Sequence, residues 1–133
     1  QHQTPQRRDQ LWQSTCFEAF VGTPQHRHYW EVNLACTGDW NVYRLDDYRT
    51  NLRPEAQIAE LPYRLLRRPD QLDLSFQLDW NGLVPPKAID LSLTAVLDHR
   101  EQGCSYWALQ HVNSEPDFHQ RGSFQRFANG ITC

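Results

Sequence analysis

The stretch HYWEVNLACTGDWNVYRLDD, residues 28–47, contains two β-rich runs separated by a turn signal. The runs cover residues 28–35 and 40–45, and Thr37-Gly38-Asp39 between them is rich in the residues that favour turns. A similar run, residues 16–21, precedes them. Three short runs in succession predict a meander of antiparallel strands, and their recurrence along the chain predicts an all-β fold, a sandwich or a barrel.

Two later runs alternate apolar and polar residues with the period of a strand. Apolar side chains stand at every second position of residues 72–78 and of residues 91–97. Further strands are expected at residues 104–109 and 124–127. The segment 55–68 has partial helical spacing, but Pro62 lies inside it, which favours a short helical turn followed by a strand and leaves its structure open at this level.

The length of 133 residues fits one domain with its own core. Residues 1–10 are polar and rich in Gln, and we expect them to form a flexible lead-in. The domain is then expected over residues 11–128, with a short tail over residues 129–133. Because the sequence has no Met, even at position 1, we expect a processed product, an excised domain or an incomplete polypeptide.

The charge pattern argues against two classes of partner. Thirteen basic and sixteen acidic residues give a net charge of −3, and the basic residues are dispersed, which disfavours nucleic acid as a ligand. No run approaches the roughly 20 apolar residues of a membrane span, so no membrane insertion is expected. No targeting segment is visible, which leaves the compartment unknown and slightly favours the cytoplasm.

The four cysteines show no paired CxxC spacing, which disfavours a zinc ribbon. They are Cys16, Cys36, Cys104 and Cys133. We expect thiols buried in β-strands. A disulfide such as Cys36 to Cys104 stays open as an alternative, and it would require export from the cytoplasm.

Alternation divides the first two runs into two faces. Phe17, Ala19 and Val21 share one face of the first run, and Trp30, Val32 and Leu34 share one face of the second; both sets are predicted to be core. The opposite faces then place Glu18 and Glu31 on one side of the sheet. Two facing carboxylates need a cation or a hydrogen-bond donor between them, and Tyr43, Arg44 and Arg49 are the nearest candidates.

This set of side chains suits a hydroxyl-rich ligand. Sugars are recognised by flat aromatic faces together with planar carboxylate, amide and guanidinium groups. We therefore predict a carbohydrate or another small molecule as the ligand. The candidate binding residues are Glu18, Glu31, Asn33, Trp40, Tyr43, Arg44, Arg49, His111 and His119.

Several alternatives remain open at the level of sequence. The two glutamates could belong to an outer-face network with arginines, or act together in glycoside hydrolysis. His26 and His28 stand two residues apart, so in an extended segment they face the same way, as two metal ligands do, but no third ligand is evident. No GxSxG, HExxH or phosphate-binding glycine loop is present, so no catalytic residue, metal site or cofactor is assigned.

Five strings in series resemble bacterial DOMON-like proteins related to family 9 carbohydrate-binding modules. They are LWQSTCFEAFV (11–21), YWEVN (29–33), DWNVYRLDDYR (39–49), SYWAL (105–109) and PDFH (116–119). The resemblance spans most of the chain in order. It implies a β-sandwich of immunoglobulin or jelly-roll type whose relatives bind sugars or, in other branches, haem.

The resemblance carries two further expectations. Proteins of this kind begin with additional strands before the position of Leu11, so the sandwich is expected to lack N-terminal strands. Its open edge would then pair with a protein partner or a missing segment. Haem in the wider superfamily is held by axial Met and His ligands; without Met, the alternative here is a bis-His arrangement of His111 and His119.

Overall fold

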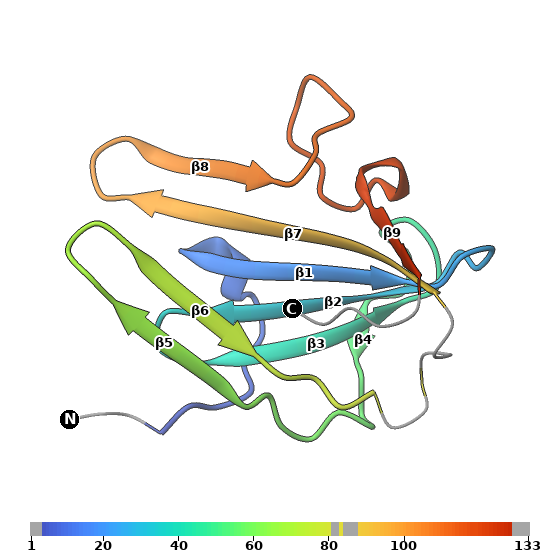
Figure 1. Ribbon diagram of the computed structural model, residues 1–133, viewed down its shortest axis with the longest axis horizontal. Helices are drawn as coiled ribbons and strands as arrows, with labels where there is room; N and C mark the ends of the chain where they lie inside the picture. The colour runs from blue at the N-terminus through green and yellow to red at the C-terminus, as the bar shows by residue number, and fades with distance from the viewer. Residues whose placement is uncertain (1–3, 81–82, 84–87, 129–133) are drawn as a thin grey trace.

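Two antiparallel sheets account for the strands in the part of the chain that is described. The structure is a computed structural model that describes residues 4–80, 83 and 88–128. Its larger, seven-stranded sheet has the order β4-β3-β2-β1-β7-β8, with β9 also pairing with β7, and β5 pairs with β6 (Figure 1). The strands are β1 (Cys16–Gly22), β2 (Tyr29–Ala35), β3 (Trp40–Leu45), β4 (Arg53–Pro54), β5 (Tyr63–Arg67), β6 (Leu72–Phe76), β7 (Ala88–His99), β8 (Gly103–Ala108) and β9 (Gln125–Ala128).

The predicted meander is confirmed, because β1, β2 and β3 are sequential antiparallel neighbours. Gly38 forms the turn between β2 and β3 with φ of 90°, a conformation that side chains with a Cβ rarely adopt. Its N–H donates to the carbonyl of Ala35 at 2.9 Å. The segment 55–68 contributes β5 at its C-terminal end, and its first part contains no helix.

One face of the large sheet packs beneath the β5–β6 hairpin, which completes a sandwich-like arrangement. We call this side the hairpin face. Its buried cluster joins residues from three strands to two from the following loop: Ala19, Trp30, Val32, Leu34, Trp40, Val42, Ile58 and Leu61. Leu74 and Phe76 of β6 pack against it. Four of the six residues that alternation predicts as core belong to this cluster, whereas Val21 is buried outside it and Phe17 is only half-buried. The predicted all-β antiparallel sandwich is confirmed.

The opposite face, which we call the pocket face, is also buried. Its cluster contains Phe20, Tyr29, Tyr43, Leu45, Val96 and Phe118. Phe118 comes from the long segment between β8 and β9, and Phe124 of the same segment packs on the cluster. Glu18 and Glu31 therefore do not project from an open surface. They lie under chain segments that the strand pattern does not reveal.

The lead-in contacts the sheet in the described residues. The Trp40 N–H donates to the Gln6 carbonyl at 3.0 Å, and the Arg8 N–H donates to the Trp40 carbonyl at 2.9 Å. The Arg7 guanidinium donates to the carbonyls of Val42, Glu55 and Ile58. These bonds attach residues 6–8 along β3. The expected tail, residues 129–133, lies outside the described residues.

The three described cysteines are free thiols in different environments. Cys16 is buried, Cys36 is half-buried and Cys104 is exposed. The expectation of thiols buried in strands is confirmed for Cys16 of β1. It is wrong for Cys36, which lies in the turn after β2, and for Cys104, which is exposed in β8 at the end of the sheet order. Cys133 lies outside the described residues. In the part of the chain that the structure describes, no helix is long and apolar enough to cross a membrane.

Candidate functional site

Glu18 and Glu31 lie on neighbouring strands and face the same side. Glu18 pairs with Asn33 in the β1–β2 register, and Glu31 stands two residues before Asn33. The carboxyls are therefore diagonal neighbours, close enough to interact. Glu18 is 6% exposed and Glu31 is 3% exposed. On its other side, Glu18 accepts a hydrogen bond of 3.2 Å from the Thr94 hydroxyl of β7.

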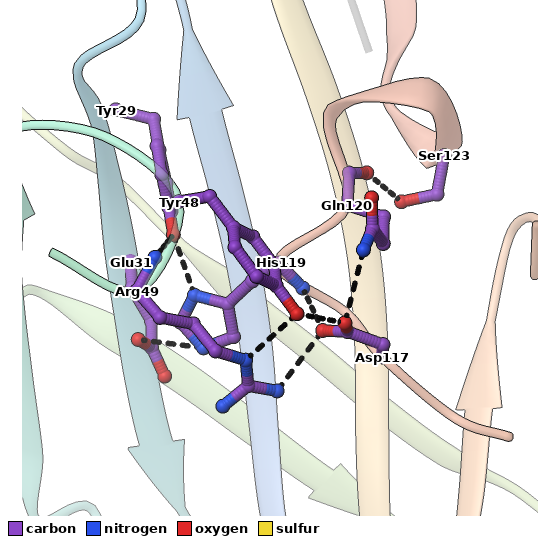
Figure 2. A network of polar contacts seen from close by, with 8 residues as sticks. All are labelled: Tyr29, Glu31, Tyr48, Arg49, Asp117, His119, Gln120 and Ser123. Carbon is purple, nitrogen blue, oxygen red and sulfur yellow. Dashed lines mark hydrogen bonds and ion pairs between the residues drawn. The ribbon is translucent and has the colours of Figure 1, made fainter. Parts of the chain in front are cut away.

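A histidine from the β8–β9 segment reaches Glu31. His119 Nε2 lies 3.7 Å from the Glu31 carboxylate, and His119 Nδ1 lies 2.7 Å from the Tyr29 hydroxyl (Figure 2). The Tyr29 oxygen also accepts the backbone N–H of Arg49 at 3.2 Å. The tyrosine proton is then free to be donated to Nδ1. In that arrangement His119 is the neutral tautomer with its proton on Nε2, the nitrogen 3.7 Å from Glu31.

Arg49 is held at the rim of the site by an ion pair. Its guanidinium donates to Asp117 Oδ1 at 2.9 Å, and its Nε donates to the Tyr48 hydroxyl at 3.3 Å. The Tyr48 hydroxyl donates in turn to Asp117 (Figure 2). Burial alone would raise the pKa of Asp117, but hydrogen bonds from Tyr48, Arg49 and Gln120 lower it. Asp117 is therefore an ionised anchor that orients Arg49.

Burial shifts the pKa values of the three titratable groups at the centre of the site. It raises the pKa of Glu18 to about 8, with a further contribution from the charge of Glu31. It raises the pKa of Glu31 to about 7, against the lowering effects of a hydrogen bond with Asn33 and of Arg49. It lowers the pKa of His119 to about 4, aided by the charge of Arg49. In each case burial disfavours the charged form.

Glu31 and His119 border a pocket of about 390 Å³. Its charged or titratable lining residues are Glu31, Arg49 and His119, and its aromatic ones are Trp12, Tyr106 and Phe118. The aliphatic lining residues are Leu45, Leu52, Val96 and Pro116. The rings of Trp12 and Tyr106 are partly open to solvent, at 36% and 48% exposure. The pocket thus combines exposed aromatic surface with a buried carboxyl.

Six of the nine predicted residues belong to this side of the sheet. Glu31, Arg49 and His119 line the pocket, and Glu18 and Asn33 are buried beside Glu31 on the pocket face. Tyr43 packs edge-on against Trp12 with ring centroids 5.7 Å apart, and its hydroxyl donates to Asp9. The structure therefore brings together the acidic, amide and histidine parts of the predicted set.

Three predicted residues lie elsewhere. Trp40 is buried in the core of the hairpin face, where the Arg7 guanidinium lies 5.0 Å from its ring centre. Arg44 is on the same face, 5.4 Å from the ring centre of Trp30. His111 is exposed, with its ring 5.9 Å from that of Phe118. Alternation separates Trp40 and Arg44 from Tyr43, so the strand pattern alone could have placed them on the far face.

The three aromatic residues that line the pocket are not among the binding residues predicted from the sequence. Trp12 lies in the one-turn 3₁₀ helix η1 (Leu11–Gln13), and Phe118 lies in the β8–β9 segment. Neither carries a periodic signal that reveals its tertiary position. Tyr106 does carry one, because alternation within β8 separates it from Trp107. Its register with Val96 of β7 confirms that it faces the pocket.

The two histidines considered as metal ligands lie outside this site. The rings of His26 and His28 are 5.2 Å apart, and the ring of His28 packs edge-on against Trp30 on the hairpin face. Among the described residues, no group of three His, Cys, Asp or Glu side chains is arranged to hold a metal ion.

The comparisons with known proteins identify a shared fold. No protein-family model and no curated protein matches the sequence. The structure is similar to the crystal structure of a "putative carbohydrate-binding protein" from Bacteroides uniformis, with a TM-score of 0.62 and 14% sequence identity. The match covers 91% of this chain and 63% of that protein. At this identity the similarity establishes a common fold.

Proposed function

We propose that the protein is a non-catalytic module that binds a carbohydrate or a closely related small molecule in the pocket of the seven-stranded sheet. The observation that carries the proposal is the buried Glu31 carboxyl at a pocket with partly exposed aromatic rings, Trp12 and Tyr106. The fold shared with a protein described as carbohydrate-binding supports it. Descent from the DOMON-like proteins related to family 9 modules is part of the proposal.

The chemistry of the pocket suits a sugar in two ways. A sugar ring has apolar C–H faces, which pack on aromatic rings such as that of Trp12, and hydroxyl groups at its edge, which need acceptors and donors. Glu31 provides an acceptor, whereas Arg49 and the Nε2–H of His119 provide donors. Because Asp117 and Tyr29 hold the two donors in place, a ligand meets a preorganised site.

Titration calorimetry against a panel of mono- and disaccharides tests the proposal. We expect heat of binding at millimolar sugar or below. Glu31→Gln and Trp12→Ala should each weaken binding by about tenfold or more, which corresponds to about 1.4 kcal/mol. The control is Glu60→Gln, at an exposed position outside the pocket, which should bind as the wild type does.

Two outcomes contradict the proposal. One is a folded protein that gives no heat with any sugar of the panel. The other is recovery of cleaved sugar after incubation, with loss of cleavage in Glu31→Gln. That result would assign the Glu18 and Glu31 pair to glycoside hydrolysis, in which two carboxyls act together with one of them protonated.

A further inference from the structure

The strand at one end of the large sheet has an unprotected edge. β8 pairs with β7, and no other described strand pairs with it. Its sequence, GCSYWA, contains no charged residue and no proline, and the next two residues are Leu109 and Gln110. Natural sheets protect such edges with charges, proline or bulges because a free edge recruits another strand. The edge of β8 has none of these features.

The register shows which backbone groups of β8 point outward. The Leu109 N–H donates to the Leu93 carbonyl, and these residues continue the β7–β8 pairing that joins Trp107 to Ala95. In an antiparallel pair, hydrogen-bonded positions alternate with open ones. Residues 105, 107 and 109 therefore bond toward β7, whereas the N–H and C=O groups of Cys104, Tyr106 and Ala108 point away from the sheet.

The hairpin face next to this edge carries exposed apolar side chains. The β5–β6 hairpin lies on the β3 side of the sheet, away from β8 (Figure 1). Leu93 is 44% exposed, Leu109 is 50% exposed and Trp107 is 62% exposed. Three large apolar side chains thus stand together on one face of β7 and β8. An open edge and an exposed apolar patch at the same place indicate a protein interface.

We propose that β8 pairs with β8 of a second copy of this chain, antiparallel and around a two-fold axis at Tyr106. A second copy fits because β8 is complementary to itself. In this register Tyr106 pairs with Tyr106 of the second copy and Cys104 pairs with Ala108, so all the outward groups meet partners. Residues 103–110 contain no charge, and no like charges oppose each other across the axis.

The dimer would have a consequence on each face of the sheet. On the hairpin face, Trp107 comes next to Ser105 and Trp107 of the second copy, which covers the most exposed ring. On the pocket face, Tyr106 lines the pocket. Tyr106 of the second copy then lies beside it and extends the aromatic wall. The dimer therefore presents two pockets side by side on one face of a continuous sheet, suited to a ligand with repeated units.

Light scattering on a sizing column tests the dimer with the full chain. We expect a mass of twice 15.7 kDa at micromolar concentrations. Trp107→Lys should weaken the dimer by about tenfold or more, because it places two charges next to the axis. Ala108→Pro should act in the same direction, since it removes an outward N–H and no bond to β7. The matched control, Leu72→Lys, changes an apolar residue of 39% exposure on β6 and should leave the mass unchanged.

Three results would overturn the proposal: a mass of 15.7 kDa at high micromolar concentration, larger open-ended oligomers, or equal weakening by Leu72→Lys and Trp107→Lys. Circular dichroism of each variant separates loss of pairing from loss of folding. Because sugar binding is measured separately, a monomer that binds sugar contradicts the dimer and leaves the proposed function standing.

Discussion

Glu18 and Glu31 have unusual protonation states at neutral pH. With pKa values raised to about 8 and about 7, Glu18 is mainly protonated and Glu31 is close to half ionised. His119, with its pKa lowered to about 4, is neutral. The two carboxyls titrate as a coupled pair. At neutral pH the site therefore offers both donors and acceptors of hydrogen bonds to a hydroxyl group.

These shifts make stability depend on pH. The folded-state pKa of Glu18 lies above its ordinary value of 4.5, so its contribution to stability is complete below pH 4.5 and is lost as pH rises through 8. Glu18→Gln removes this titration while keeping the size of the side chain. We expect the variant to be more stable than the wild type at pH 8, by on the order of 4 kcal/mol, and the difference to shrink toward pH 5.

Urea unfolding at a series of pH values measures this difference. His119 provides an internal control, because its lowered pKa has the opposite sign: its contribution is complete above pH 6.5 and is lost as pH falls through 4. The loss of stability as pH falls through 4 should therefore persist in Glu18→Gln. Parallel pH profiles of the wild type and the variant between pH 5 and pH 8 would contradict the assignment of a buried, protonated Glu18.

Among the elements, the strands are predictable from the sequence and the connecting segments are not. Alternation places Glu18 and Glu31 on one face because side-chain direction in a strand depends only on parity. The same rule places Trp40 and Tyr43 on opposite faces. Trp40 is in the predicted site only because an aromatic ring at a strand end suits stacking on a sugar. Residues such as Trp12 and Phe118 reach the pocket from segments without periodicity, and their positions depend on tertiary contacts.

One side chain, Arg7, adds four hydrogen bonds to the backbone bonds that attach the segment before η1. Arg7 donates to Asn41 Oδ1 and to the carbonyls of Val42, Glu55 and Ile58, at 2.8 to 3.0 Å. Arg7→Ala leaves several of these acceptors without partners, so we expect a loss of about 2 to 3 kcal/mol in the free energy of unfolding. Chemical denaturation measures it.

The control for this prediction is Arg8→Ala. Arg8 forms an ion pair of 3.0 Å with Asp39, but its side chain is 51% exposed. Exposed pairs contribute little, so we expect a loss of about 1 kcal/mol or less. Equal losses in the two variants would show that the carbonyl contacts of Arg7 do not hold the segment on β3.

For the whole molecule, the pocket exists because separate segments converge on the pocket face. Trp12 comes from η1, Arg49 from the β3–β4 connection, and Phe118 and His119 from the β8–β9 segment. The sheet supplies the carboxyls beneath them. Ligand binding should therefore depend on how firmly the segments are attached as well as on the residues that touch the ligand.

Arg121 attaches the β8–β9 segment to the connection between β1 and β2 and to β7. Its guanidinium donates to the carbonyls of Thr23, His26 and His28 and to the carboxylate of Asp90. The contact is close: a Cβ on Gly22 would lie 2.6 Å from the Arg121 Cζ atom, so a larger residue there would displace the guanidinium.

Arg121→Lys keeps the charge but removes the planar fork that makes these bonds. We expect faster amide hydrogen exchange over residues 109–124, unchanged exchange in β2, and weaker sugar binding although Arg121 does not line the pocket. The control is Arg126→Lys, because Arg126 pairs with the same Asp90 at 2.9 Å but its side chain is 63% exposed. If both variants exchange alike over residues 109–124, the pairing with Asp90 and not the carbonyl fork holds the segment over the pocket.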